Sequence, residues 1–411
     1  MSATSACRLC RAPLTRTFVD LGSMPLANAF LRPEQLRGPE PHFPLHARVC
    51  GECLLVQVEA VVSPQEIFGD YAYFSSYAAS WVEHARRFAR DAAARFGLGK
   101  SSMVVEVASN DGYLLQHFVA MGIPCLGIEP AANVAAVARA AGIPTEVCFM
   151  GRTAAAALRD RGVTADLVVA NNVLAHVPDL HDFVAGITAL LKPLGVLSVE
   201  FPHLLRLIEE TQFDTIYHEH LCYFSLRPVE RLFAEHGLRI FDVEQLPTHG
   251  GSLRVLATPR DGNHAEGPGA AAVRRAEAAA GLDKLSTYDG FGARVKVVCR
   301  ELVNFLAAAR EANRKVVAYG AAAKGNTLLN SCRVGPQDIA FVVDRNVHKQ
   351  GRLTPGSHLP IRAPEAIVEA RPDYLLILPW NLRDEIMRNL AAIRTWGGRF
   401  VVPIPHLQVL P

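Results

Sequence analysis

The sequence has no apolar run long enough to cross a bilayer; residues 163–177, for instance, are interrupted by Asp166, Asn171, Asn172 and His176. Residues 1–6 are polar and lead directly into cysteines, without the apolar segment of a secretory signal. Lysine and arginine are dispersed and the net charge is only +2, so no basic stripe suits a nucleic-acid backbone. We therefore expect a soluble cytoplasmic protein with no membrane or nucleic-acid partner.

The sequence also lacks GxGxxG, the glycine pattern that binds the pyrophosphate of a dinucleotide. This absence disfavours a nicotinamide-dependent oxidoreductase, although the chain does carry strand–glycine–helix units that would suit one. The 411 residues, half of them hydrophobic, exceed the ~250 to 300 residues of a usual single core. At least two domains are expected.

Four of the nine cysteines form two pairs with metal-ligand spacing, Cys7-x2-Cys10 and Cys50-x2-Cys53. In a reducing compartment such pairs favour four thiolates converging on one Zn²⁺ over a disulfide framework, redox pairs or unliganded thiols. The 39 residues between the pairs exceed the gap of a compact zinc ribbon. With four sulfur ligands the metal would have no open position, so its role would be structural. The five single cysteines are expected to be buried small hydrophobic residues.

Strands alternate with helices from residue 103 onward, which indicates a doubly wound parallel sheet with its ligand at the carboxyl ends of the strands. An amphipathic helix is predicted over residues 79–96 and another over 180–192. A Gly/Ala stretch at residues 262–269 indicates a domain boundary. It precedes one long helical segment, residues 271–313, and a second, smaller α/β region from residue 315.

The turn after the first predicted strand indicates a nucleoside pocket. Gly112 lets the backbone approach a ligand, and Glu129 at the end of the next strand can accept hydrogen bonds from a ribose diol. One glycine suits an adenosyl group without phosphates, so S-adenosylmethionine (SAM) is favoured over NAD. Asn171 and Asn172 can hold the amino-acid part or the adenine edge, or form a polar turn. The predicted cofactor residues are Glu106, Ser109, Asn110, Gly112, Glu129, Asn171 and Asn172.

A dense group of titratable side chains lies about a hundred residues further on, at Tyr217-His218-Glu219-His220. These residue types can supply a general base, an orienting partner and an oxyanion donor. The alternative is a polar strand edge or helix cap. Successive residues of an extended segment face opposite sides, so His218 is expected to point the other way from its neighbours.

Over essentially its whole length the chain resembles the SAM-dependent sugar C-methyltransferases that act on nucleotide-linked keto-sugars. Three segments carry the resemblance: residues 212–220 (QFDTIYHEH), 105–112 (VEVASNDG) and 70–77 (DYAYFSSY). The resemblance implies a zinc-binding module (residues 1–68), a central Rossmann-like SAM methyltransferase domain (69–262) and a smaller Rossmann-like C-terminal domain that binds the nucleotide sugar (263–411). It also implies methyl transfer to C3 of a 4-keto-deoxysugar of the dTDP-linked type, in deoxysugar and antibiotic biosynthesis.

Methylation of carbon requires an enolate, which needs a base for the C3 proton and a donor for the oxygen. His220 is the candidate base, Glu219 orients an imidazole or holds a sugar hydroxyl, and Tyr217 or Tyr71 donates to the oxyanion. In similar enzymes the histidine at the position of His176 faces the sugar, which makes it a second acid/base candidate. Further candidate substrate contacts are Tyr73, Ser76, Tyr77, Arg294 and Lys324.

Lys324 follows Gly320 in a turn that opens a helix, where backbone N–H groups can receive a diphosphate; the alternative is a turn used only for packing. Other functions remain open beside C-methylation: an oxidoreductase, an O- or N-methyltransferase, and a zinc-stabilised binding module without catalysis. A monomer or weak homodimer is expected.

Overall fold

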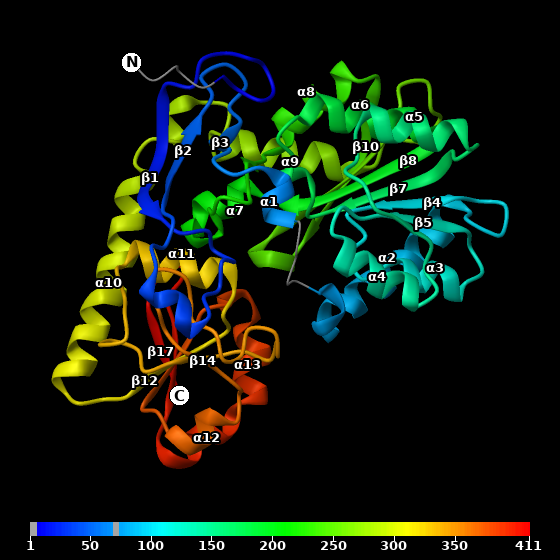
Figure 1. Cartoon of the computed structure of the whole chain (residues 1–411). Helices are drawn as coiled ribbons and strands as arrows, with labels where there is room; N and C mark the ends of the chain where they lie inside the picture. The colour runs from blue at the N-terminus through cyan, green and yellow to red at the C-terminus, as the bar shows by residue number, and fades with distance from the viewer. Residues whose placement is uncertain (1–5, 69–73) are drawn as a thin grey trace.

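The computed structural model describes residues 6–68 and 74–411, so the predicted site residues Tyr71 and Tyr73 lie outside the described part. Within it the chain forms three sheets, each with its own covering elements (Figure 1). No helix in the described ranges is long and apolar enough to cross a membrane.

The central sheet has seven strands in the order β10-β11-β8-β7-β4-β5-β6. Strands β4 to β8 pair in parallel, and β11 runs antiparallel to both β8 and β10. The strand order reverses between β4 and β7, and the carboxyl ends there form the crevice in which such sheets bind ligands. The strands are β4 (Val104–Val107), β5 (Cys125–Ile128), β6 (Thr145–Glu146), β7 (Ala165–Asn171), β8 (Leu191–Pro202), β10 (Leu238–Leu246) and β11 (Ser252–Pro259).

The helix predicted over residues 79–96 is confirmed as α2 (Ala79–Phe96). Its buried residues, Ala85, Phe88, Ala89 and Ala92, recur at helical spacing, and Gly97 ends it in the left-handed conformation at φ 63°. The other helices around the central sheet are α3 (Leu115–Ala120), α4 (Ala132–Ala140), α5 (Arg152–Asp160), α6 (Leu180–Leu190), α7 (Leu204–Glu209), α8 (Leu226–Glu235) and α9 (Pro268–Ala279).

The N-terminal sheet has the order β1-β2-β3-β9 and is antiparallel. Three strands come from the cysteine module: β1 (Arg16–Met24), β2 (Phe43–Val49) and β3 (Val56–Val58); α1 (Pro64–Phe68) follows them. The fourth, β9 (Cys222–Tyr223), comes directly after Tyr217–His220 and pairs Gln57 with Cys222. The candidate catalytic segment is therefore attached by backbone pairing to the cysteine module.

The C-terminal sheet has the order β14-β13-β12-β15-β16-β17, parallel except for β17. Its strands are β12 (Val316–Tyr319), β13 (Val342–Val343), β14 (Ile361–Arg362), β15 (Tyr374–Ile377), β16 (Arg399–Val402) and β17 (Gln408–Leu410). Its helices are α10 (Phe291–Glu311), α11 (Ala323–Ser331), α12 (Ala366–Ala370) and α13 (Arg383–Asn389).

The single long helix predicted over residues 271–313 is wrong. The chain forms α9 and α10 instead, because Gly281 and Gly290 between them adopt φ values of 74° and 79°, which a continuing helix does not allow. The helix α9 packs against β10 and α8 of the central sheet, whereas α10 packs against β1. The division of the chain at residues 68/69 and 262/263 stays a prediction.

The long interval between the two cysteine pairs docks on the C-terminal domain. Leu31 and Leu353 exchange backbone hydrogen bonds of 3.0 and 2.8 Å. Further along, the Glu40 carboxylate accepts hydrogen bonds from the Gly356 backbone N–H at 2.9 Å and from His358 at 2.8 Å. This contact accounts for the 39 residues that a compact zinc ribbon would not need.

Candidate active site

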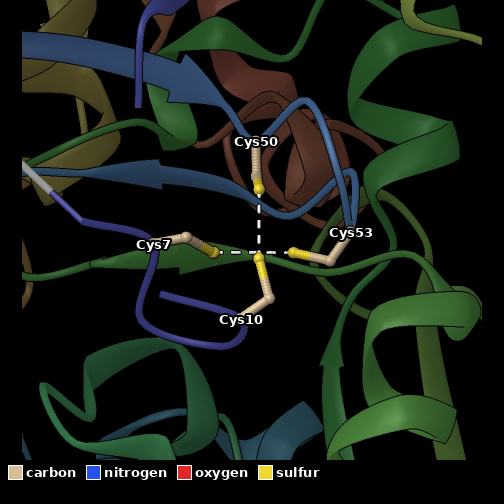
Figure 2. Close-up of side chains that lie close together, drawn as sticks. All are labelled: Cys7, Cys10, Cys50 and Cys53. Carbon is tan, nitrogen blue, oxygen red and sulfur yellow. Dashed lines mark hydrogen bonds between the residues drawn. The ribbon is translucent and has the colours of Figure 1, made fainter. Parts of the chain in front are cut away.

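The four paired cysteines meet at one point. Their Sγ atoms all lie within 4.8 Å of one another, with 3.5 Å between Cys7 and Cys53 and 3.4 Å between Cys10 and Cys50 (Figure 2). A tetrahedral Zn²⁺ with bonds of about 2.3 Å separates its sulfurs by about 3.8 Å, so the cluster fits this ion. The Gln57 side-chain amide donates to the Cys7 sulfur at 3.2 Å, which stabilises a thiolate. The four sulfur ligands leave no open position for catalysis.

The turn after β4 is shaped for close approach of a ligand. Ala108, Asn110 and Gly112 have φ values of 55°, 52° and 83°. A Cβ on Gly112 would stand 2.1 Å from Ile143 Cδ1, so only glycine fits there. The Glu129 carboxylate at the end of β5 accepts hydrogen bonds from the backbone N–H groups of Asn110 at 2.9 Å and Ala131 at 2.8 Å. It thereby ties the first two strand ends together.

Several polar atoms at this sheet edge are buried without a hydrogen-bond partner among the described residues. They are Glu106 Oε2, Ser109 Oγ, Asn171 Oδ1 and Asn172 Oδ1. Burial raises the pKa of Glu106 well above its usual range, and the nearby Glu129 and Asp111 carboxylates raise it further. A ligand with hydroxyl and amino donors would satisfy such acceptors, as the ribose and amino-acid parts of SAM do.

The predicted substrate residue Ser76 contacts the cofactor turn. Its backbone N–H and hydroxyl donate to Asp111 Oδ2 at 3.1 and 2.5 Å, while the Ser75 N–H donates to Asn110 Oδ1 at 2.8 Å. Tyr77 is 57% exposed and its ring lies 5.6 Å from that of Phe74. The segment around Ser76 therefore covers the turn. Tyr71 and Tyr73, outside the described residues, stay predictions.

A backbone contact brings two candidate imidazoles together. Leu221 donates its N–H to the Ala175 carbonyl at 2.7 Å, so the residues before and after these two, His220 and His176, become neighbours. Their ring centroids lie 4.7 Å apart, edge to face. His176 follows the end of β7, and His220 precedes β9; the contact joins the carboxyl edge of the central sheet to the N-terminal sheet.

Tyr217 and His220 form a hydrogen-bonded pair of defined polarity. His220 Nδ1 lies 3.0 Å from the Thr215 carbonyl oxygen, which only accepts, so Nδ1 carries the proton. His220 Nε2 is then the acceptor in its 2.7 Å contact with the Tyr217 hydroxyl, which donates. Burial, the nearby His176 and the Lys324 cation hold the pKa of His220 well below its usual range. The imidazole is neutral, with its lone pair toward the phenol.

His176 is also neutral, because burial lowers its pKa to about 4. Its ring donates a hydrogen bond to the Glu219 backbone carbonyl, which leaves the lone pair on the other ring nitrogen. His218 turns toward the Phe43 carbonyl oxygen at 3.2 Å, whereas His220 faces Tyr217. The segment is a turn and not an extended strand, since the His220 N–H donates to the Tyr217 carbonyl at 2.9 Å, and this turn separates the two imidazoles.

Glu219 is 5% exposed, and its Oε1 accepts a hydrogen bond of 2.7 Å from the Asn28 side-chain amide. Burial raises the pKa of Glu219 to about 7, against the hydrogen bond from Asn28 and the positive charge of Lys349. A buried carboxyl group whose pKa is raised toward neutrality is a feature of acid–base sites.

The C-terminal domain contributes Lys324. Its ammonium donates to Asn381 Oδ1 at 2.7 Å and lies 4.7 Å from the Trp380 ring centre. The Trp380 indole N–H donates to Asp214 Oδ2 at 2.7 Å, and burial raises the pKa of Asp214 to about 6. The positive charge of Lys324 lowers the pKa of both His220 and Asp214. Arg294 is exposed on α10, with its guanidinium 5.4 Å over the Phe291 ring.

Sequence reasoning missed several residues at this site. His249 lies 3.3 Å from Asn172 Nδ2, and its ring packs edge-on to Trp81 at 5.1 Å. Lys349 donates to the Ala321 carbonyl at 2.8 Å. The sequence carries only a weak signal for such residues, namely a polar residue in a predicted turn. Asn28, near several prolines, and His249, before two glycines, are of this kind.

Three family descriptions match successive parts of the chain: a zinc binding domain over residues 7–68, a methyltransferase domain over 81–243 and a C-methyltransferase C-terminal domain over 247–405. The C-methyltransferase NovU of Streptomyces niveus is 39% identical over 407 residues, covering 98% of this chain and 96% of that protein.

More limited similarities cover less than half of the chain. A ubiquinone biosynthesis O-methyltransferase of Rhodopseudomonas palustris (strain BisA53) is 27% identical over 34% of this chain and 62% of its own length. A solved SAM-dependent methyltransferase of Clostridium acetobutylicum ATCC 824 covers 44% of this chain and 92% of its own, at 12% identity and a TM-score of 0.36. Because the match to NovU spans both chains almost completely, this chain belongs to the family of zinc-binding, SAM-dependent C-methyltransferases.

Proposed function

We propose that the enzyme transfers a methyl group from SAM to C3 of a nucleotide-linked 4-keto-deoxysugar, of the dTDP type, in cytoplasmic deoxysugar biosynthesis. The observation that carries this proposal is the Tyr217–His220 pair, whose phenol donates to a neutral imidazole at 2.7 Å. Methylation of oxygen or nitrogen starts from a nucleophile that already has a lone pair. Methylation of carbon needs a base that first removes a C–H proton, and the cluster supplies one.

The cofactor residues would be those at the ends of β4, β5 and β7, among which Glu129 suits the ribose hydroxyls. Each Glu129 oxygen accepts one backbone hydrogen bond and retains a lone pair for a further donor. Bound there, SAM supplies an electrophilic methyl group on a sulfonium. The protein's part is to generate the carbon nucleophile.

The 4-keto group acidifies the C3 hydrogen, and the Tyr217–His220 pair takes that proton. His220 Nε2 is its final position, reached directly or through the phenol, because Nδ1 already holds a proton against the Thr215 carbonyl. The resulting imidazolium lies beside the enolate and offsets its charge. His176 lies beside His220, with 4.7 Å between the ring centroids, and suits a sugar hydroxyl or a second proton transfer.

The nucleotide would bind the C-terminal domain. Asp344, just after β13, accepts hydrogen bonds from the N–H groups of Ala321 at 2.8 Å and Asn346 at 2.8 Å. Glu129 binds the turn after β4 in the same pattern. It accepts one hydrogen bond from the N–H of Asn110 in that turn and one from the N–H of Ala131, two residues further along the chain. The C-terminal sheet thus repeats the strand–turn–acid arrangement of a nucleoside site. Lys324, in the first turn of α11, would then lie near the diphosphate of the bound nucleotide sugar.

The test is the position of the methyl group in the product. The purified enzyme is incubated with ¹³C-methyl SAM and a panel of dTDP-, UDP- and GDP-linked 4-keto sugars, and the products are analysed by NMR and intact mass. The proposal expects a methyl carbon bonded to C3. A methyl group on oxygen or nitrogen, or no turnover with any keto-sugar, would overturn it.

A further inference from the structure

A short loop of the N-terminal module, residues 27–31, lies between the catalytic segment and the C-terminal domain. The fully buried Asn326 of α11 donates its side-chain amide to the Ala27 carbonyl at 2.7 Å. At the other end, Leu31 exchanges backbone hydrogen bonds with Leu353. Lys349 lies 4.9 Å from the ring centre of Phe30. Both ends of the loop are therefore held by the C-terminal domain.

Asn28, in the middle of this loop, makes a contact in the opposite direction, toward the catalytic segment. Its side-chain amide donates to Glu219 Oε1 at 2.7 Å. An amide nitrogen can only donate, so it supports a carboxylate without adding a charge to the site. Since the loop is fixed on both sides, the amide is held in place before substrate arrives.

The groups facing the Glu219 carboxyl come from two segments of the described chain. Asn28 faces it from the N-terminal loop, and Lys349 faces it from the segment after β13. The Asp344 carboxylate also interacts electrostatically with Lys349. His176 contacts only the Glu219 backbone carbonyl. The flanking His218 turns toward Phe43, and the flanking His220 toward Tyr217 and Thr215. Burial raises the pKa of Glu219 to about 7, and Asn28 and Lys349 are the two groups that oppose this rise.

We propose that Asn28 is a positioning residue for the methyl transfer, which holds Glu219 as an oriented carboxylate, with Lys349 supplying the opposite charge. The inference rests on the proposed function, and it takes Glu219 to hold a sugar hydroxyl, as the family resemblance implies. A residue of the zinc-binding module then acts in the chemistry through a partner on the methyltransferase domain. Neither module alone could set the charge of this group.

The test compares Asn28→Ala and the near-isosteric Asn28→Asp with wild type. Both changes remove a donor to the carboxylate, and the second adds a like charge, so both raise the pKa of Glu219. The acid limb of the pH profile of kcat/KM should move upward by about one to two pH units, with activity at pH 7 about tenfold lower and recovered at higher pH. Lys349→Met should move the limb in the same direction.

Glu40→Gln is the matched control, because it weakens the docking of the same N-terminal segment on His358 and Gly356 without touching Glu219. Its acid limb should stay at the wild-type position. A second readout needs no substrate: infrared difference spectra between pH 6 and pH 8 report the protonated carboxyl band that Glu219→Gln removes. In Asn28→Ala that band should persist to higher pH than in wild type.

An infrared titration of Glu219 unchanged in both Asn28 variants would overturn the inference. So would a loss of activity that is equal at all pH values, because that pattern describes a merely structural role. Failure of the wild type to methylate any keto-sugar would instead defeat the proposed function, and the infrared titration would still decide the link between Asn28 and Glu219.

Discussion

Replacing His220 by asparagine should separate binding from chemistry. The imidazole makes two hydrogen bonds, of 2.7 Å with Tyr217 and 3.0 Å with the Thr215 carbonyl. Losing a neutral hydrogen bond in a folded protein costs about 1 kcal/mol, and asparagine can still donate one, so the variant should fold and bind SAM. The base, however, is lost. A general base contributes about 10² to 10⁴ in rate, which corresponds to a barrier higher by about 3 to 5 kcal/mol.

The assay is exchange of the C3 hydrogen in D₂O without SAM, followed by NMR, since the base can act before methyl transfer. Wild type should exchange this hydrogen and His220→Asn should not, while calorimetry shows normal SAM binding. Tyr217→Phe tells a direct base from a relay: it keeps exchange if His220 Nε2 meets the substrate itself and loses it if the phenol carries the proton. If His220→Asn exchanges at the wild-type rate while Tyr217→Phe or His176→Asn does not, the assignment of the base is wrong.

Four further outcomes follow from the structure. Metal analysis should find one zinc per chain in the wild type and a loss of it in Cys10→Ser, and full retention would contradict the four-sulfur site. Glu129→Ala should weaken SAM binding in calorimetry by tens-fold or more, since charge-assisted hydrogen bonds contribute about 2 to 3 kcal/mol; an unchanged Kd would mean a misplaced pocket. Gly112→Ala should lower the melting temperature, because its Cβ would stand 2.1 Å from Ile143; an unshifted melting curve would refute the clash. Asp214, with a pKa raised to about 6, binds its proton more tightly in the folded than in the unfolded protein. The stability that this proton contributes, about 3 kcal/mol, is therefore lost as the pH rises from about 4 to 6. Asp214→Asn should flatten this part of the curve of unfolding free energy against pH, and a curve identical to wild type would contradict the raised pKa.

Features set by neighbouring residues could be predicted from the sequence. The helix Ala79–Phe96 was readable from its apolar spacing and Gly97, and the cysteine cluster from its CxxC spacing. The break between α9 and α10 could not be read as easily, since Gly281 and Gly290 flank residues that suit a helix. Periodicity does not reveal a φ value.

The candidate site was predictable in composition but not in assembly. Tyr217, Glu219 and His220 stand together in the chain. Asn28 reaches Glu219 from 191 residues away in the sequence, and Lys349 acts on Glu219 from the C-terminal domain. The direction of the Tyr217–His220 hydrogen bond depends on the Thr215 carbonyl, a backbone group with no signature in the sequence. Pairings of this kind follow from strand register and domain docking.

The strand β9 has a consequence for how the protein is made. The cysteine module leaves the ribosome before β9, but the edge of its sheet at β3 is completed only by residues 222 and 223, and its docking loop is held by residues 326–358. Until then β3 presents unpaired backbone groups, which are a template for aggregation. This sheet is thus completed long after its first three strands are synthesised, and a fragment ending before residue 222 would carry that open edge permanently.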